Sequence, residues 1–132
     1  MRIGELARLA GCLPETIRFY EQKQLLQPPA RNRANYRQYD TGHLDRLNFI
    51  RRCRSLGMSL DEVQTLLCCQ DQPDKPCDAV NDLVDRHIVE IDRQIADLRI
   101  LHAQLADLRQ GCDSTRPAGQ CAILKRLGET RA

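Results

Sequence analysis

The chain has 132 residues, of which 4% are aromatic and none is tryptophan, so any hydrophobic core has to be built from aliphatic side chains. No run of about 18 apolar residues occurs and the start does not resemble a signal peptide, which argues against membrane insertion or secretion and predicts a soluble, cytoplasmic protein. The net charge of +2 hides an excess of basic residues in 1–56 (11 Lys or Arg against 5 Asp or Glu), typical of a polyanion-binding surface, and an acidic excess in 57–132 (13 against 9).

Two short helices joined by a tight turn are predicted at the start of the chain. Four apolar residues have the spacing of one helix face, namely Ile3, Leu6, Ala7 and Ala10. Gly11 ends this run, and Pro14 suits the first position of a second helix, through about Gln22, because proline has no N–H to leave unpaired there. This order is the helix-turn-helix pattern.

A short hairpin, or wing, is predicted within residues 31–40, which are rich in Arg, Asn and Tyr. Helical spacing resumes at Leu44 and stops at Gly57. Ser59 followed by Glu62 is a capping-box signature that predicts the start of a further helix. Together these elements predict a winged helix-turn-helix domain in residues 1–70.

A linker at 71–77 is expected to lead into a long helix over residues 78–110. Its apolar residues alternate steps of four and three, with His102 at the missing position: Val84, Ile88, Ile91, Ile95, Leu98 and Leu105. Such a narrow stripe needs a partner to cover it and predicts a two-stranded coiled coil. Gly111 is expected to end the helix with a positive φ. Residues 111–132 are predicted to form a loop and a short closing helix.

Three cysteines bracket this long helix. If residues 78–110 are one helix, Cys77 lies about 50 Å from Cys112 in a single chain, whereas an antiparallel second copy brings Cys77 of one chain to Cys112 and Cys121 of the other. Three thiolates suit a soft or borderline divalent metal ion. The alternative is that each cysteine is a small buried hydrophobe.

The remaining candidates for metal chemistry are weaker. Cys53 is expected in the core, Cys68 and Cys69 in helix-end packing, and Cys12 in a buried turn. Three polar residues of the long helix are candidates for contacts around the metal ligands or for a subsidiary site with harder ligands: Asn81, His87 and Glu90.

DNA binding is predicted from the order helix, turn, helix, basic wing. In such a domain the second helix enters the major groove while the wing holds phosphates. The candidates for base-edge or groove contacts are Thr16 and Arg18. The candidates for phosphate or sugar contacts are Tyr20, Arg31, Arg37 and Tyr39. The alternative is a solvated arginine surface with Tyr20 in the core.

No enzymatic activity is predicted. The chain has no Gly-rich phosphate loop and no His-Glu-x-x-His motif, and the spacing of Cys112 and Cys121 is not the Cys-x-x-Cys of dithiol oxidoreductases. Two non-enzymatic alternatives to a metal-binding protein that acts on DNA remain open. One is a metal-buffering protein without an operator, and the other is a redox sensor that forms a reversible disulfide between Cys112 and Cys121.

Motifs along nearly the whole chain resemble the MerR family of metal-responsive transcriptional regulators. They are IGELARLAGC, ETIRFYEQKQLL, RNRANYRQY, HLDRLNFIRRCRSLGMSLDEVQTLL and the terminal Cys-x8-Cys loop. The segment DQPDKPCDAVNDLVDRHI is similar to the lead- and cadmium-responsive branch, typified by PbrR and CadR. The chain departs from the family at Leu13-Pro14, where Ser or Thr usually stands closer to the second helix, and it lacks the His-rich tail of some cadmium regulators.

The resemblance implies a mainly α-helical homodimer with N-terminal winged helix-turn-helix domains, an antiparallel coiled coil and two symmetric metal sites. It also implies a palindromic operator between promoter elements that are too far apart for RNA polymerase, and a metal-bound form that bends and untwists this DNA. Three thiolates without an obvious fourth ligand favour Pb(II) as the inducer. Cd(II), Zn(II) and Hg(II) are the alternatives.

Overall fold

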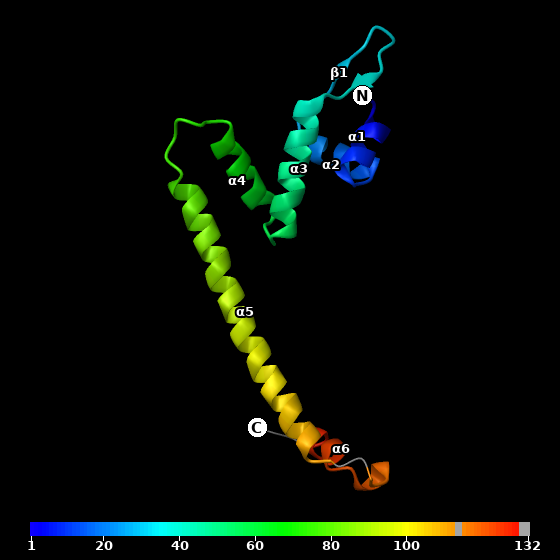
Figure 1. Ribbon diagram of the computed structural model, residues 1–132, viewed down its shortest axis with the longest axis vertical. Coiled ribbons are helices and arrows are strands. Elements are labelled where there is room, and N and C mark those ends of the chain that lie inside the picture. The colour runs from blue at the N-terminus through cyan, green and yellow to red at the C-terminus, as the bar shows by residue number, and fades with distance from the viewer. Residues whose placement is uncertain (113–114, 130–132) are drawn as a thin grey trace. The chain divides into compact units, whose positions relative to one another are not determined.

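The structure is a computed structural model that describes residues 1–112 and 115–129 (Figure 1). It is mainly helical, as predicted, with one two-stranded sheet in the described part. The chain divides into two compact units, Met1–His87 and Ile88–Ala132. None of the helices in the described residues is long and apolar enough to cross a membrane.

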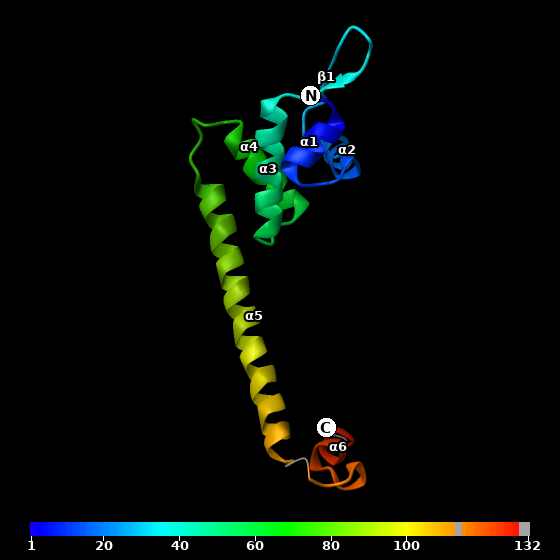
Figure 2. The ribbon, with the colours of Figure 1, turned by 45° about the vertical axis from the view of Figure 1, so that its right-hand side comes forward.

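The predicted helix-turn-helix is present in the first unit. Helix α1 spans Ile3–Ala10 and helix α2 spans Pro14–Gln22, with Pro14 in its first turn. Gly11 ends α1 in the left-handed region, at φ 71°, which favours a residue without a Cβ. Helix α1 lies beside both α2 and α3, Thr41–Ser55 (Figure 1 and Figure 2).

The wing is also confirmed, as a short antiparallel hairpin of β1 (Ala30–Arg31) and β2 (Arg37–Gln38). Its turn is closed by the side chain of Asn32, whose Oδ1 accepts hydrogen bonds from the N–H groups of Ala34 and Tyr36 at 2.9 and 3.0 Å. Asn35 takes the left-handed conformation at φ 64°, which asparagine tolerates better than most residues.

Two capping boxes set the starts of the next helices. Ser59 and Glu62 open α4, Leu60–Gln70, as predicted. Helix α3 begins at Thr41, earlier than the apolar spacing indicated, because Asp40 and His43 cap it reciprocally at 3.1 Å. Histidine replaces the usual Glu or Gln at the third position of this box, so no standard sequence signature revealed it.

The core of the first unit is aliphatic, as the composition requires. Its largest fully buried side chains come from α1 through the start of α5: Leu6, Ile17, Leu47, Ile50, Val63, Leu67 and Leu83. Cys53 is buried among them, as expected, and burial raises the pKa of its thiol.

Helix α5 spans Asp78–Gln110, the range predicted from the sequence. Only Leu83 on this helix is buried among the described residues, and it packs into the core of the first unit. The predicted apolar stripe is exposed along the rest of the helix, from 38% at Val84 to 66% at Leu105.

The expectation of a positive φ at Gly111 was wrong. The end of α5 instead tightens into i to i−3 hydrogen bonds, from Gly111 N–H to Leu108 and from Cys112 N–H to Arg109, which satisfy terminal carbonyls without a left-handed residue. The second unit continues with a 3₁₀ turn, η1 (Ala118–Gln120), and the predicted closing helix α6 (Ala122–Leu127).

Candidate DNA-binding surface and metal centre

Four of the predicted DNA contacts are accessible in the first unit. Thr16 is half-buried and Arg18 exposed on α2, the second helix of the helix-turn-helix. Arg31 and Arg37 are exposed on the two strands of the hairpin. The structure thus places basic side chains on both elements that a winged helix-turn-helix uses to bind DNA.

The two predicted tyrosine contacts are buried instead. Tyr20 is 8% exposed and Tyr39 is 2% exposed, and both belong to the core of the first unit. The ring of Tyr20 therefore lies in the core, as the alternative to DNA binding predicted. A phosphate contact from either tyrosine remains a prediction.

Glu21 joins the hairpin to α2, a role that no sequence pattern indicated. Its Oε1 accepts a hydrogen bond from the hydroxyl of Tyr39 at 2.5 Å, and its Oε2 lies 3.3 Å from Nη1 of Arg37. Burial, with the adjacent Glu21 carboxylate, raises the pKa of Tyr39, so its hydroxyl remains the donor.

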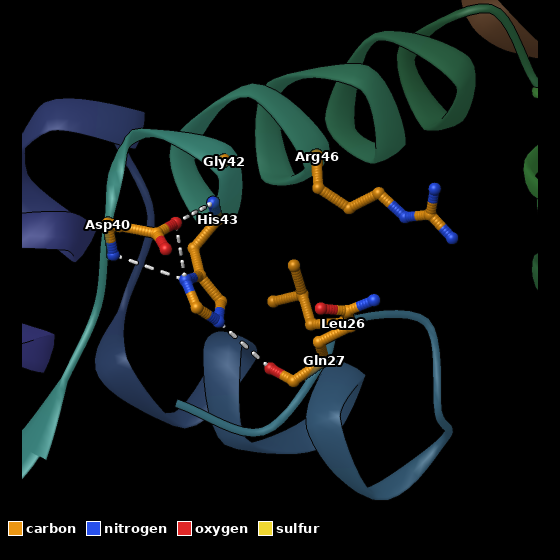
Figure 3. Close-up of a pocket in the computed structure, with 6 residues that line it drawn as sticks. All are labelled: Leu26, Gln27, Asp40, Gly42, His43 and Arg46. Atoms are coloured by element: carbon orange, nitrogen blue, oxygen red, sulfur yellow. Dashed lines mark hydrogen bonds and ion pairs between the residues drawn. The ribbon is translucent and has the colours of Figure 1, made fainter. Parts of the chain in front are cut away.

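A cavity of about 280 Å³ lies between α3 and the segment that follows α2, lined by Leu26, Gln27, Asp40, Gly42, His43 and Arg46 (Figure 3). The His43 Nε2 lies 3.1 Å from the Gln27 carbonyl oxygen. Arg46 donates to the Leu25 carbonyl and binds both carboxylate oxygens of Asp71, at 2.8 and 3.0 Å. Since both side chains are bonded to protein groups, they connect three segments of the fold and are not available as ligands.

In the second unit, the structure brings Cys112 and Cys121 together. Their Sγ atoms lie 3.8 Å apart, and both residues are half-buried. Arg109 at the end of α5 donates to the Cys112 carbonyl at 2.5 Å, and Arg126 on α6 binds Asp107 on α5 at 2.9 Å. The loop between the cysteines includes residues 113 and 114, which lie outside the described residues.

Cys121 lies immediately before α6, where the local backbone favours its thiolate. The backbone N–H of Leu124 is the main cause of a lowered pKa at Cys121, with smaller contributions from the N–H of Ile123 and the thiol of Cys112. Hydrogen bonds to the charged form favour deprotonation. A lowered pKa favours the thiolate, which is the form in which a cysteine binds metal.

The Cys112–Cys121 pair fits a bound thiophilic metal ion. Two sulfurs that each lie about 2.3 Å from one ion at a tetrahedral angle are about 3.8 Å apart, the separation found here. The described residues contain no group of three or more His, Cys, Asp or Glu side chains that would hold a metal ion.

Cys77, the third predicted ligand, is exposed at the residue before α5. Among the predicted accessory residues, Asn81 lies next to it, with its Nδ2 at 3.9 Å from the Cys77 Sγ. His87 contacts Glu62 on α4 instead, at 2.7 Å. Glu90 pairs with Arg93 on the helix surface at 3.9 Å.

The other four cysteines do not join this pair, and Cys53 among them is buried in the core. Cys12 is half-buried in the turn, and burial raises the pKa of its thiol against the opposing effect of Arg51. Cys68 is exposed beside the Gln64 amide, at 3.6 Å, and Cys69 is half-buried near the end of α4.

A winged helix-turn-helix followed by a long helix with an exposed apolar stripe is the arrangement of a DNA-binding regulator. The family model for MerR HTH family regulatory proteins matches residues 1–68, and the one described as MerR, DNA binding matches residues 44–108. The chain belongs to the MerR family and is a metal-responsive transcriptional regulator.

Individual relatives cover almost the whole chain. The transcription regulator PbrR691 from Ralstonia metallidurans CH34, solved in complex with lead(II), is 50% identical, with a TM-score of 0.84 over 96% of this chain and 98% of that one. MerR from Bacillus megaterium MB1, solved with mercury(II), is 35% identical, with a TM-score of 0.74 over 98% and 100%. A ZntR homolog from Haemophilus influenzae is 43% identical over 83% of this chain and 82% of its own length.

Proposed function

We propose that this protein is a Pb(II)-responsive regulator that represses its promoter without metal and activates it when a three-cysteine site is filled. Cys112 and Cys121 of one chain and Cys77 of a second chain hold the ion. The observation that carries this proposal is the 3.8 Å separation of the Cys112 and Cys121 sulfurs, which form no three-ligand cluster with His, Cys, Asp or Glu among the described residues of one chain. The protein has no enzymatic role in this scheme.

A homodimer is supported by the exposed stripe of α5. Five large aliphatic side chains between Ile88 and Leu105 are 42% to 66% exposed at heptad spacing, namely Ile88, Ile91, Ile95, Leu98 and Leu105. An antiparallel second copy covers this stripe and brings the start of each α5 to the end of the other. Each dimer then holds two equivalent metal sites.

The response to metal is a coupling between the thiol site and the DNA. The dimer binds a palindromic operator through its two winged helix-turn-helix domains, and the metal-bound form deforms the spacer so that RNA polymerase engages both promoter elements. Couplings of this kind are typically about 1 to 3 kcal/mol, equivalent to about 5- to 150-fold in affinity. Deforming the DNA consumes part of the binding free energy.

Lead is the first choice of inducer because the 50% identical relative was solved with that ion. Three thiolates without a fourth ligand also suit Pb(II). Hg(II) is supported by the mercury complex of the 35% identical relative. Cd(II) and Zn(II) remain alternatives, since thiolates bind all of these ions. A competition series with the four ions, read together with in vitro transcription, ranks them.

Serine substitution of the cysteines tests the shared site. Cys77→Ser, Cys112→Ser and Cys121→Ser are each expected to abolish metal-induced transcription and to leave operator binding without metal within about twofold of wild type. Cys68→Ser, at an exposed cysteine outside the site, is the matched control and should respond as wild type does.

Mixing chains with different substitutions tests whether the site is shared between subunits. A heterodimer of one Cys77→Ser chain and one Cys112→Ser chain retains one complete site and regains one bound metal per dimer. If every heterodimer stays without metal, each site is made by one chain and the proposal fails.

A thiol redox sensor is the second candidate, supported by the same 3.8 Å distance, which is short enough for the two sulfurs to form a disulfide after a small movement. Metal titration under strong reductant separates the two functions. A redox sensor gives no transcriptional response there.

A further inference from the structure

The contact between Glu62 and His87 joins α4 to α5 at the edge of the first unit. The Glu62 Oε2 lies 2.7 Å from the His87 Nε2, and both side chains are largely shielded, at 29% and 22% exposure. Since a carboxylate only accepts, the imidazole N–H donates to it. The contact is short for a hydrogen bond between nitrogen and oxygen, as expected when one partner is ionised.

Glu62 uses its two carboxylate oxygens on two different elements. Oε1 accepts the Ser59 N–H at 2.9 Å and so completes the capping box of α4, while Oε2 is bonded to His87. The pKa of Glu62 is lowered, with the Ser59 N–H as the main cause and His87 as a further one. One side chain thus fixes the start of α4 and holds α5 against it.

His87 is the last partly buried residue of α5 before a long exposed stretch. Val80, Leu83 and His87 follow steps of three and four and therefore share one helix face. Val80 and Leu83 pack against the core, and His87 binds Glu62. From Ile88 through Leu105 every residue of α5 is exposed.

The segment that carries Cys77 lies between two fixed points. Asp71, at the end of α4, is held by both guanidinium nitrogens of Arg46 on α3. Beyond Cys77, the chain is held again by Leu83 and by the Glu62–His87 contact. The eight residues 72–79 between these points are all exposed. A force applied at Cys77 therefore acts on the Arg46–Asp71 pair on one side and on the docked start of α5 on the other.

We propose that Glu62 and His87 are positioning residues that pass the metal-induced movement of α5 to the winged helix-turn-helix domain. This inference rests on the proposed function, because it takes Cys77 as a metal ligand. His87 then serves in coupling through Glu62, and not as a ligand of a subsidiary metal site. Loss of the contact leaves metal binding and operator binding in place and weakens the link between them.

The test compares Glu62→Gln, His87→Gln and the double variant as full-length proteins. Glutamine at position 62 can still cap α4, because Gln serves in a capping box as Glu does, so this change removes the charged partner of His87 and keeps the helix start. Arg93→Gln is the matched control, since it removes the exposed Glu90–Arg93 pair on the same helix. For each variant we measure operator affinity with and without Pb(II), Pb(II) affinity without DNA, thermal unfolding, and amide hydrogen exchange in residues 80–90.

Each single variant is expected to lose most of the metal-dependent change in transcription, about fivefold or more, with Pb(II) affinity and metal-free operator affinity within about twofold of wild type. The double variant should be no worse than either single one, because all three weaken the same contact. Faster hydrogen exchange in residues 84–90 should accompany the loss in the absence of metal. Arg93→Gln should behave as wild type.

Three results would overturn the inference. One is an unchanged metal response in variants that unfold at a lower temperature, which assigns the contact a structural role alone. Another is a drop in Pb(II) affinity in His87→Gln but not in Glu62→Gln, which makes His87 a ligand. The third is an additive loss in the double variant. Failure of the proposed function would look different, because the wild-type protein itself would not respond to metal.

Discussion

The substitution Leu98→Ala tests whether the exposed stripe of α5 forms the dimer interface. Leu98 is 63% exposed in one chain, so most of its side chain is available for burial by a partner. The substitution removes three carbons, each worth about 0.8 kcal/mol when fully buried, so about 1.5 kcal/mol is lost per chain at this exposure. A symmetric dimer contains the change twice, and about 3 kcal/mol raises the dimer dissociation constant about 150-fold.

The matched control is Ile100→Ala. Ile100 is 58% exposed and also loses three carbons, but it lies two residues away, about 200° around the helix, on the face opposite the stripe. Sedimentation velocity over a dilution series, in the presence of a chelator, measures the dissociation constant of both variants. Ile100→Ala is expected to stay within about threefold of wild type.

The reasoning is refuted if the two variants weaken the dimer equally, or if Leu98→Ala has no effect. Equal weakening would mean that the partner covers the helix on both faces and that heptad spacing does not define the contact. No effect would mean that the stripe is covered by something other than a second copy.

Three further predictions concern the first unit. Glu21→Ala removes a negative charge beside the hairpin, and by electrostatics alone this change strengthens DNA binding. We expect operator affinity to fall about fivefold instead, because the loss of a hydrogen bond worth about 1 kcal/mol frees Arg37 and Tyr39. Tighter binding in a fluorescence anisotropy titration would contradict this. Leu83→Ala should lower the free energy of unfolding by about 3 kcal/mol in urea titrations, because Leu83 is fully buried. A change below about 1 kcal/mol would show that α5 does not dock through this side chain. The Arg46 guanidinium lowers the pKa of Asp71 from its ordinary 3.8, so this carboxylate stabilises the fold above that pH, and the stabilisation is lost as the pH falls through the lower folded-state pKa. The difference in unfolding free energy between wild type and Asp71→Asn should therefore shrink in acid. A difference that stays constant with pH would exclude the ion pair as its cause.

The helices were largely predictable because their signals are local. Pro14, Gly11 and the Ser59–Glu62 box mark helix ends through interactions within one turn, and the heptad spacing between the linker and Gly111 indicated α5. The start of α3 was missed because His43 completes a capping box in place of Glu or Gln. Cys112 and Cys121 were recognisable as the two ends of one short loop, and their sulfurs lie 3.8 Å apart in the structure, while their role as metal ligands stays a prediction.

What the sequence by itself determined is the set of elements and the chemical types available, because periodicity, capping and thiol chemistry depend on residues that are neighbours in the chain. The tertiary structure alone decided which distant side chains meet. It placed Tyr39 and Arg37 on Glu21, and His87 on Glu62, across separations of 16 to 25 residues. The physical reason is that such contacts arise from the packing of whole helices against one aliphatic core, and no local pattern encodes where two packed surfaces will bring a carboxylate and its donor together.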